Sequence, residues 1–168
     1  RKIEKETGGF AFSKPQAAGQ LPLGGKLFSA EQGNLPLPAR GRIIARYGQR
    51  NQAGIRSKGI SIATLLGASV VAPHDGKILY AGPFRTYGLL LIIGHGEGYH
   101  TLIAGMSRID GAVGQWLLAG EPVGLMGNSP MSEIKPNEKK YAGSATGDNS
   151  PILYLELRQN GEPINPLS

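Results

Sequence analysis

The sequence predicts an all-β domain of antiparallel strands, and two observations lead to this prediction. After residue 35 the chain consists of short apolar and β-branched runs, which turn signals separate at the spacing of a strand plus a turn. No long stretch in this part shows the 3.6-residue period of an amphipathic helix. The 168 residues include 26 Gly and 12 Pro, which suits many tight turns, and an apolar fraction of 40% is sufficient for a core.

Eight strands are expected in order along the chain. Their ranges are 43–46, 59–63, 69–72, 76–81, 89–94, 98–103, 122–126 and 152–158. A turn is expected over 73–76, between the third and fourth strands, where Asp75-Gly76 is a good hairpin signal. Residues 107–114 are expected to form a loop or a single helical turn, and residues 119–122 a turn.

Two segments are expected to lie outside the β core. Residues 1–34 form an irregular or partly helical leader, because a charged start is followed by repeated Gly and Pro. Residues 129–150 are polar and have few large apolar groups, so they are expected to form a mobile surface loop within the domain 35–168. A chain that starts at Arg1 rather than Met is expected to be a fragment, with any signal peptide outside it.

The positive charge of the chain is concentrated in one stretch. Of 18 basic residues, six lie between Glu31 and Asp75, where there is no acid; the other twelve equal the twelve acids in number. The six are Arg40, Arg42, Arg46, Arg50, Arg56 and Lys58. Such a patch attracts an anionic partner, or it simply improves solubility. Nucleic acid is not expected, because only Tyr47 could stack on a base here.

The residues offer few means of catalysis. The chain has no Cys, which excludes disulfides, thiolate metal sites and a cysteine nucleophile. Of the three histidines, His95 and His100 could approach one another across a hairpin, but their spacing is not a recognised ligand pattern and no third ligand is evident. The longest apolar run, 88–94, is far too short to span a membrane.

Several blocks of sequence, in order, resemble the LytM domain, the fold of the zinc-dependent peptidoglycan endopeptidases of the lysostaphin type. The blocks are 41–48, 58–62, 70–82, 87–88, 92–99, 113–116, 119–124 and 153–158. Together they cover about three quarters of the chain. The resemblance implies an antiparallel β-sheet domain with long loops.

The zinc ligands of that family do not occur at the matching positions. Its H-x-x-x-D motif falls on Ser57 and Ser61, and the last His of its H-x-H falls on Tyr154. The first His of the latter becomes Ile152, and the remaining family histidine falls near Gly105. Hydroxyls and an un-ionised phenol bind Zn²⁺ poorly. The resemblance therefore implies a degenerate, non-catalytic domain without a metal or other cofactor.

Among such degenerate domains, the chain resembles the murein hydrolase activators of the EnvC type. The resemblance implies a periplasmic protein of a Gram-negative bacterium that activates cell-wall N-acetylmuramoyl-L-alanine amidases during cell division. It also implies a coiled coil ahead of the domain, of which 1–6 would be a remnant. That coiled coil would recruit the protein to a membrane complex.

The same resemblance implies a groove that binds the regulatory segment of the amidase in place of the former substrate. The residues that it assigns to this groove are Lys58, Ser61, Tyr87, Tyr154 and Arg158. Strand alternation supports part of the assignment, because Tyr154, Glu156 and Arg158 share one face of their strand while the intervening leucines face the other way.

Two alternative functions stay open at this point, together with the question of which segment controls access to the groove. The chain could be a zinc endopeptidase with relocated ligands among His74, His95 and His100, or a passive module that holds peptidoglycan in the old groove. Either the leader 1–34 or the loop 129–150 could occlude the groove.

Overall fold

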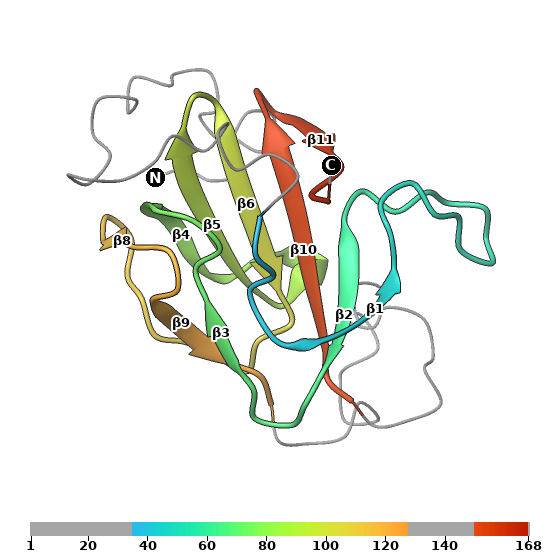
Figure 1. The fold of residues 1–168 in the computed structure, drawn as a ribbon, viewed down its shortest axis with the longest axis horizontal. Helices are drawn as coiled ribbons and strands as arrows, with labels where there is room; N and C mark the ends of the chain where they lie inside the picture. Colours follow the sequence, from blue (N-terminus) through green and yellow to red (C-terminus); the bar gives the residue numbers. More distant parts are fainter. Residues whose placement is uncertain (1–34, 128–149, 168) are drawn as a thin grey trace.

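The computed structural model describes residues 35–127 and 150–167, which form two antiparallel sheets (Figure 1). The larger sheet has the order β1-β2-β10-β6-β5-β4-β8, with β11 paired to β10, and the smaller has the order β3-β9-β7. The strands are β1 (Gly41–Ala45), β2 (Ile60–Thr64), β3 (Ser69–Val71), β4 (Gly76–Pro83), β5 (Leu89–Gly96), β6 (Tyr99–Ala104), β7 (Arg108–Ile109), β8 (Trp116–Leu117), β9 (Pro122–Leu125), β10 (Ile152–Gln159) and β11 (Glu162–Ile164). A single 3-10 turn, η4 (Arg85–Tyr87), joins β4 to β5.

The predicted all-β fold is confirmed, and all eight expected strands are present. Three further strands, β7, β8 and β11, were not predicted, because segments of two or three residues are too short to show alternation. The predicted loop or helical turn over 107–114 contains β7. The leader 1–34 and the loop residues 129–149 lie outside the described residues.

The prediction of a hairpin at 73–76 was wrong. The segment does form a bend between β3 and β4, but these strands belong to different sheets. β3 pairs with β9, whereas β4 pairs with β5 and β8. The Asp75 carboxylate accepts a hydrogen bond from the backbone N–H of Ala119 at 2.7 Å, so it links this crossover to the turn before β9.

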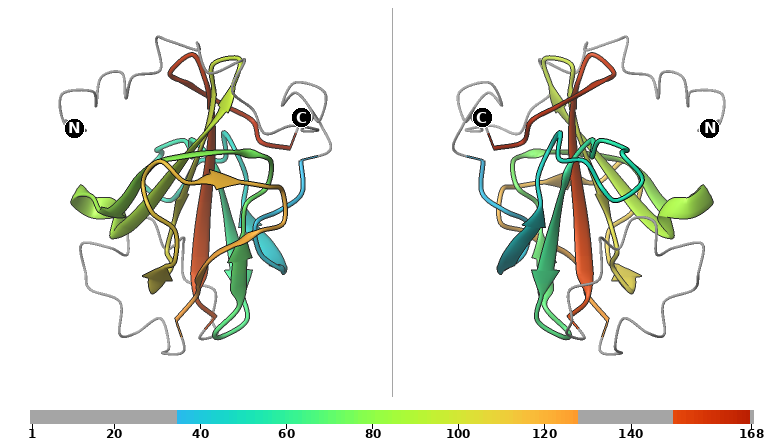
Figure 2. Two further views of the ribbon diagram at one scale, coloured as in Figure 1. Left: turned by 90° about the vertical axis from the view of Figure 1, so that its left-hand side faces the viewer. Right: turned by 90° about the vertical axis from the view of Figure 1, so that its right-hand side faces the viewer.

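The main core lies between the two sheets. Ile62, Ile93 and Leu155 of the larger sheet pack in one cluster with Val70 of β3 and Val123 of β9, and all five side chains are fully buried or nearly so. The strand β10 lies at the centre of the larger sheet, where it pairs with β2 on one side and β6 on the other. Both views of Figure 2 show β10 and β2 side by side through the middle of the molecule.

A second apolar cluster covers the opposite face of the larger sheet. On β5, Leu91 and Ile93 join the main core, while Leu90 and Ile92 join this second cluster with Leu102. A strand buried on both faces needs a continuous apolar run rather than alternation, which explains the sequence of β5. The second cluster also contains Tyr154 of β10, with Phe84 and Tyr87 packed against it.

Two glycines allow the backbone to pass close to β10. A Cβ on Gly59 would overlap the carbonyl oxygen of Leu155, and a Cβ on Gly105 would overlap that of Ile152. Gly105 also has a φ of +109°, which side chains rarely adopt. These glycines therefore fix how closely β2 and the end of β6 approach the central strand.

We expect Gly105→Ala to lower the free energy of unfolding by about 3 kcal/mol, because it adds steric overlap to backbone strain. Gly120→Ala is the matched control: its φ is +86° and nothing lies within 4 Å of the new Cβ. It should cost only about 1 kcal/mol. Urea unfolding curves followed by circular dichroism measure both. Equal losses would contradict the packing role of Gly105.

Candidate functional site

The predicted groove residues come from three parts of the fold. Lys58 lies in an exposed bend just before β2, Ser61 lies in β2, and Tyr87 ends the turn η4. Tyr154 and Arg158 lie on β10. The turn η4 is far from β10 in sequence, so only the folded sheet brings Tyr87 to this strand.

Tyr87, Tyr154 and Ser61 lie close together. The rings of Tyr87 and Tyr154 have centroids 6.3 Å apart at an angle of 42°, and Phe84 packs against Tyr87 at 6.2 Å. Ser61 is directly opposite Tyr154 in the ladder between β2 and β10. Ser61 and Tyr154 are both buried, whereas Tyr87 is half-buried.

Glu156 connects Tyr154 to Arg158. The hydroxyl of Tyr154 donates to Glu156 Oε1 at 2.8 Å, and Arg158 Nε donates to Oε2. The carboxylate is fully buried, so these two hydrogen bonds compensate for the water contacts that it lacks. The sequence placed these three residues on one strand face and left open a pair between Arg158 and Glu156, but it did not indicate that one carboxylate would bind both Tyr154 and Arg158.

Arg158 is the more accessible end of this group. Its side chain is 17% exposed, and Nε is the nitrogen engaged by Glu156. In the ladder between β10 and β6 it lies opposite His100. Burial lowers the pKa of His100 to about 4, and the positive charge of Arg158 adds to the effect. A neutral His100 avoids a second positive charge beside the guanidinium.

Ser57 is engaged by its own bend. Its hydroxyl donates to the carbonyl oxygen of Gly59 at 2.7 Å and accepts from the N–H of Gly59 at 3.3 Å. Of the three positions that the resemblance assigns to zinc ligands, the structure therefore brings Ser61 and Tyr154 together and gives Ser57 a local role in the turn before β2.

The histidines form a structural group instead of a hairpin pair. His100 is opposite Gly94, not His95, in the ladder between β5 and β6. His95 packs edge-on against His74, with ring centroids 5.8 Å apart. Across residues 35–127 and 150–167, no cluster of three or more His, Asp or Glu side chains could hold a metal ion.

The hydrogen bonds of His95 fix its tautomer. Nδ1 lies 2.7 Å from the carbonyl oxygen of Asp75, which only accepts, so Nδ1 carries the proton. Nε2 then accepts from the hydroxyl of Thr101 at 2.6 Å. Complete burial lowers the pKa of His95 to about 3, so the neutral ring is maintained. The ring thus joins the crossover before β4 to the hairpin of β5 and β6.

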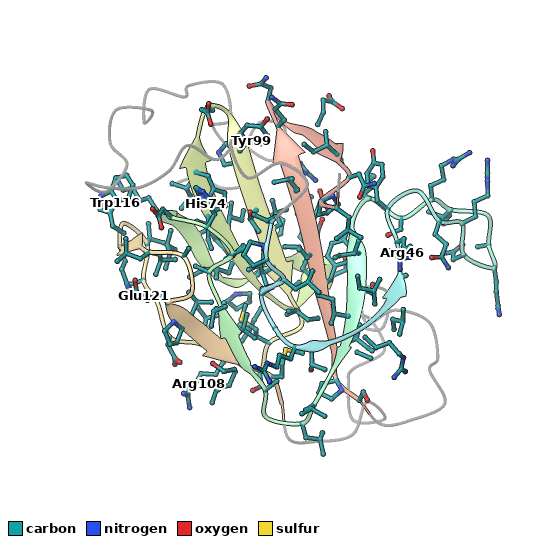
Figure 3. All side chains as sticks on the ribbon, in the orientation of Figure 1. Arg46, His74, Tyr99, Arg108, Trp116 and Glu121 are labelled. Atoms are coloured by element: carbon teal, nitrogen blue, oxygen red, sulfur yellow. The ribbon has the colours of Figure 1, made fainter. Side chains whose placement is uncertain are left out.

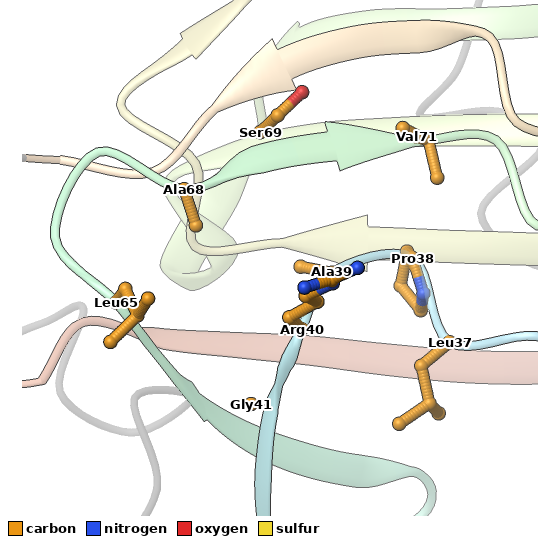
Figure 4. A pocket seen from close by; sticks show the side chains of 9 residues that line it. All are labelled: Leu37, Pro38, Ala39, Arg40, Gly41, Leu65, Ala68, Ser69 and Val71. Carbon is orange, nitrogen blue, oxygen red and sulfur yellow. The ribbon is translucent and has the colours of Figure 1, made fainter.

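A pocket near the start of the described chain lies elsewhere (Figure 4). It is lined by Leu37, Pro38, Ala39, Arg40, Gly41, Leu65, Ala68, Ser69 and Val71. None of the predicted groove residues lines it, and its walls are mostly aliphatic.

No helix among the described residues has the length and apolar character needed to cross a membrane.

Comparison with known proteins confirms the resemblance. The model of peptidase family M23 matches residues 55–166, which is more than half of the chain. The murein hydrolase activator EnvC of Escherichia coli is 31% identical over 137 residues, which cover 82% of this chain and 29% of that protein. The murein hydrolase activator NlpD of Escherichia coli is 31% identical over 131 residues, which cover 77% and 29%.

The fold is also shared with a solved peptidase. Lysostaphin, from Staphylococcus simulans, superimposes with a TM-score of 0.57 at 20% identity, over 76% of this chain and 49% of that one. At this identity the likeness establishes the fold alone, and it confirms the expected lysostaphin-like architecture. The chain spans only 29% of the length of the EnvC and NlpD proteins that it matches.

The buried histidines predict a loss of stability in acid. The unfolded chain protonates its histidines near pH 6.5, whereas folded His100 and His95 do so only at about 4 and about 3. The unfolded state therefore binds more protons below pH 6.5, and each histidine lowers the free energy of unfolding by about 1.4 kcal/mol per pH unit. For each histidine, this loss of stability stops once the pH has fallen below the pKa of that histidine in the folded state.

Urea unfolding at about pH 7.5, 6 and 5 checks this expectation, since at pH 5 each histidine should cost about 2 kcal/mol. His95→Gln cannot titrate, so its stability should fall less steeply over the same range, whatever its stability at pH 7.5. Parallel slopes for the two proteins would show that His95 does not carry the effect.

The buried carboxylate predicts a strong coupling between its partners. Arg158→Leu removes the cation beside the buried charge of Glu156, and we expect a loss of about 3 kcal/mol in the free energy of unfolding. Glu156→Gln in the same chain removes that charge and should recover part of the loss. A double-mutant cycle by urea unfolding measures the coupling; additive effects would mean that the ion pair contributes nothing.

Proposed function

The chain belongs to peptidase family M23, and from this premise we propose that it is a non-catalytic activator of cell-wall N-acetylmuramoyl-L-alanine amidases in cell division. In this proposal residues 35–168 are a degenerate LytM domain, and residues 1–34 are a leader that links it to further parts of a longer protein. The protein works in the periplasm of a Gram-negative bacterium, where it contacts the amidase and, through it, peptidoglycan.

The observation that carries the proposal is the chemistry at Ser57, Ser61 and Tyr154. Where catalytic relatives hold a metal, this chain has two hydroxyls and a phenol, and these groups bind Zn²⁺ poorly. The phenol of Tyr154 already donates a hydrogen bond to the carboxylate of Glu156. Without a metal there is no Lewis acid and no water of lowered pKa to attack a peptide. The names of the relatives EnvC and NlpD, murein hydrolase activators, support the same reading.

The proposed partner surface consists of a more accessible and a more buried part. Lys58 is exposed, and Tyr87 and Arg158 are half-buried, so these three present contacts to the amidase. Ser61 and Tyr154 are buried, so in this proposal they support the accessible residues and do not contact the amidase over a large area themselves. Tyr154 supports the ring of Tyr87 and, through Glu156, fixes the guanidinium of Arg158. Tyr and Arg are the residue types that most often anchor protein interfaces.

Activation is then a shift in the population of amidase conformations. The groove binds the regulatory segment of the amidase only when this segment has left the enzyme's active site. A change from 1:99 to 99:1 in favour of the open enzyme requires about 5.5 kcal/mol of differential binding. Two or three interface anchors of about 2 kcal/mol each supply this amount.

The decisive experiment mixes the 168-residue chain with purified amidases and measures dye release from labelled sacculi. We expect Tyr87→Ala and Lys58→Ala to reduce stimulation tenfold or more at subsaturating concentration, because each removes an accessible anchor. Leu65→Ser and Arg108→Gln are the matched controls, since both side chains are exposed and lie on other elements. Both controls should stimulate like the unchanged chain.

Two results would overturn this proposal. Stoichiometric zinc in protein purified without chelator, together with cleavage of peptidoglycan cross-links by the chain alone, would identify an endopeptidase. Retention on sacculi that survives Tyr87→Ala and Lys58→Ala, with no effect on any amidase, would identify a passive wall-binding module.

A further inference from the structure

The connection between β1 and β2 is a structured ribbon, residues 46–59, that extends beyond the edge of the sheet (Figure 1). Its two arms continue the ladder, because the N–H of Gly48 donates to the Ser57 carbonyl at 2.8 Å and the N–H of Ser57 donates to the Gln49 carbonyl at 2.9 Å. Farther out, Arg50 and Arg56 form an antiparallel bridge. Arg46 lies at the base of this ribbon, at one edge of the larger sheet, and Trp116 lies at the other edge (Figure 3).

Hydrogen bonds hold both ends of the ribbon. At the tip, Asn51 Oδ1 accepts from the N–H groups of Ala53 and Ile55 at 2.8 and 3.0 Å. At the base, the hydroxyl of Tyr47 donates to the carbonyl oxygen of Pro163 in β11 at 3.1 Å. The ribbon is therefore preorganised, and a ligand would not have to order it.

The ribbon carries four cations and no carboxylate. Arg46, Arg50, Arg56 and Lys58 are all exposed. In the part of the chain that the structure describes, the two ion pairs are Arg108–Asp110 and Arg158–Glu156, and neither involves the ribbon. The positive charge of this element is thus available to an external anion.

Arg50 and Arg56 break a rule of strand pairing. They are directly opposite one another, and like charges at opposed positions destabilise a ladder. Each donates one Nη1 hydrogen bond along the ribbon, Arg50 to the Gly54 carbonyl at 3.0 Å and Arg56 to the Gly48 carbonyl at 3.2 Å. The other guanidinium donors remain available. Neither arginine has a carboxylate partner among the described residues, and local conflicts of this kind are expected at functional sites.

Apolar side chains stand beside these charges. Ile55, next to Arg56 at the tip, is 63% exposed, and Tyr47 is 37% exposed. A small anion in solution would engage the arginines and leave Ile55 in water. The boundary between the headgroups and acyl chains of a bilayer accommodates both kinds of group at once.

We propose that the ribbon docks the domain on an anionic phospholipid surface, with Arg50 and Arg56 on headgroup phosphates and Ile55 at the acyl boundary. The inference rests on the charge, exposure and pairing of residues 46–59, and it does not depend on amidase activation. Nucleic acid does not fit, since Tyr47 is the only aromatic residue of the ribbon.

Co-sedimentation of the 168-residue chain with vesicles tests the proposal. Vesicles of phosphatidylcholine mixed with phosphatidylglycerol and cardiolipin are compared with vesicles of phosphatidylcholine alone. We expect binding only to the anionic vesicles, and we expect it to weaken as NaCl is raised from about 0.05 to about 0.5 M.

Substitutions locate the binding on the ribbon. Arg50→Gln/Arg56→Gln should weaken partitioning by about 25-fold, about fivefold for each arginine. Ile55→Ser should weaken it by about tenfold. The matched controls are Arg108→Gln, which removes an exposed arginine elsewhere, and Leu65→Ser, which removes a side chain that is 73% exposed at another turn. Both should bind like the unchanged chain.

The proposal fails if anionic vesicles do not retain the chain at low salt, or if the ribbon variants bind as well as the controls. It also fails if the ribbon variants lose amidase stimulation without lipid while vesicle binding is unaffected, because the ribbon would then contact an acidic protein. Vesicle binding without stimulation of any amidase would leave this inference standing and overturn only the proposed function.

Discussion

The carboxylate of Glu156 is fully buried in the middle of the central strand, and the site depends on how its charge is compensated. β10 has a paired strand on each side, so a group in its middle has no route to water along the sheet. Tyr154 and Arg158, two residues away in either direction, reach it because alternate residues share a face. Breaking this group is costly, which keeps three side chains in one arrangement. Tyr87 then packs on a ring that cannot move freely.

Under our proposal, this arrangement would let one fold serve two kinds of chemistry. A catalytic member of peptidase family M23 organises its groove around an ion, which orders the side chains that ligate it. In our proposal the present chain orders the corresponding strand by an internal ion pair and a phenol. The free energy needed to order the groove side chains is then supplied by contacts within the protein, and a partner segment can bind in the absence of a metal.

Sequence patterns identified the large elements well and the small ones poorly. The apolar run of β5 and the alternation of β10 are properties of single strands, so they could be read directly. The pairing of β3 with β9 depends on residues some 50 positions apart, and for that reason the Asp75-Gly76 signal was misread as a hairpin. For the site, alternation placed Tyr154 with Arg158, but it left open whether Tyr154 would line a groove or pack as a buried aromatic side chain with a bonded hydroxyl. The hydrogen bond between Asp75 and His95 could likewise not be predicted from the sequence, because it joins a crossover to a hairpin.

The direct opposition of Ser61 and Tyr154 has an evolutionary consequence. In the proposed assignment, regaining a metal would require an imidazole at Ser57, an imidazole at Tyr154 and a carboxylate at Ser61. The last two changes fall on the buried pair. Of these two, the first removes the hydroxyl that Glu156 accepts from, and the second introduces another buried anion on the neighbouring strand. Either of these two reversions alone would destabilise the protein before any ion could bind. In the proposed assignment, the two changes are therefore epistatic: a return to a metal site would pass through intermediates of low stability.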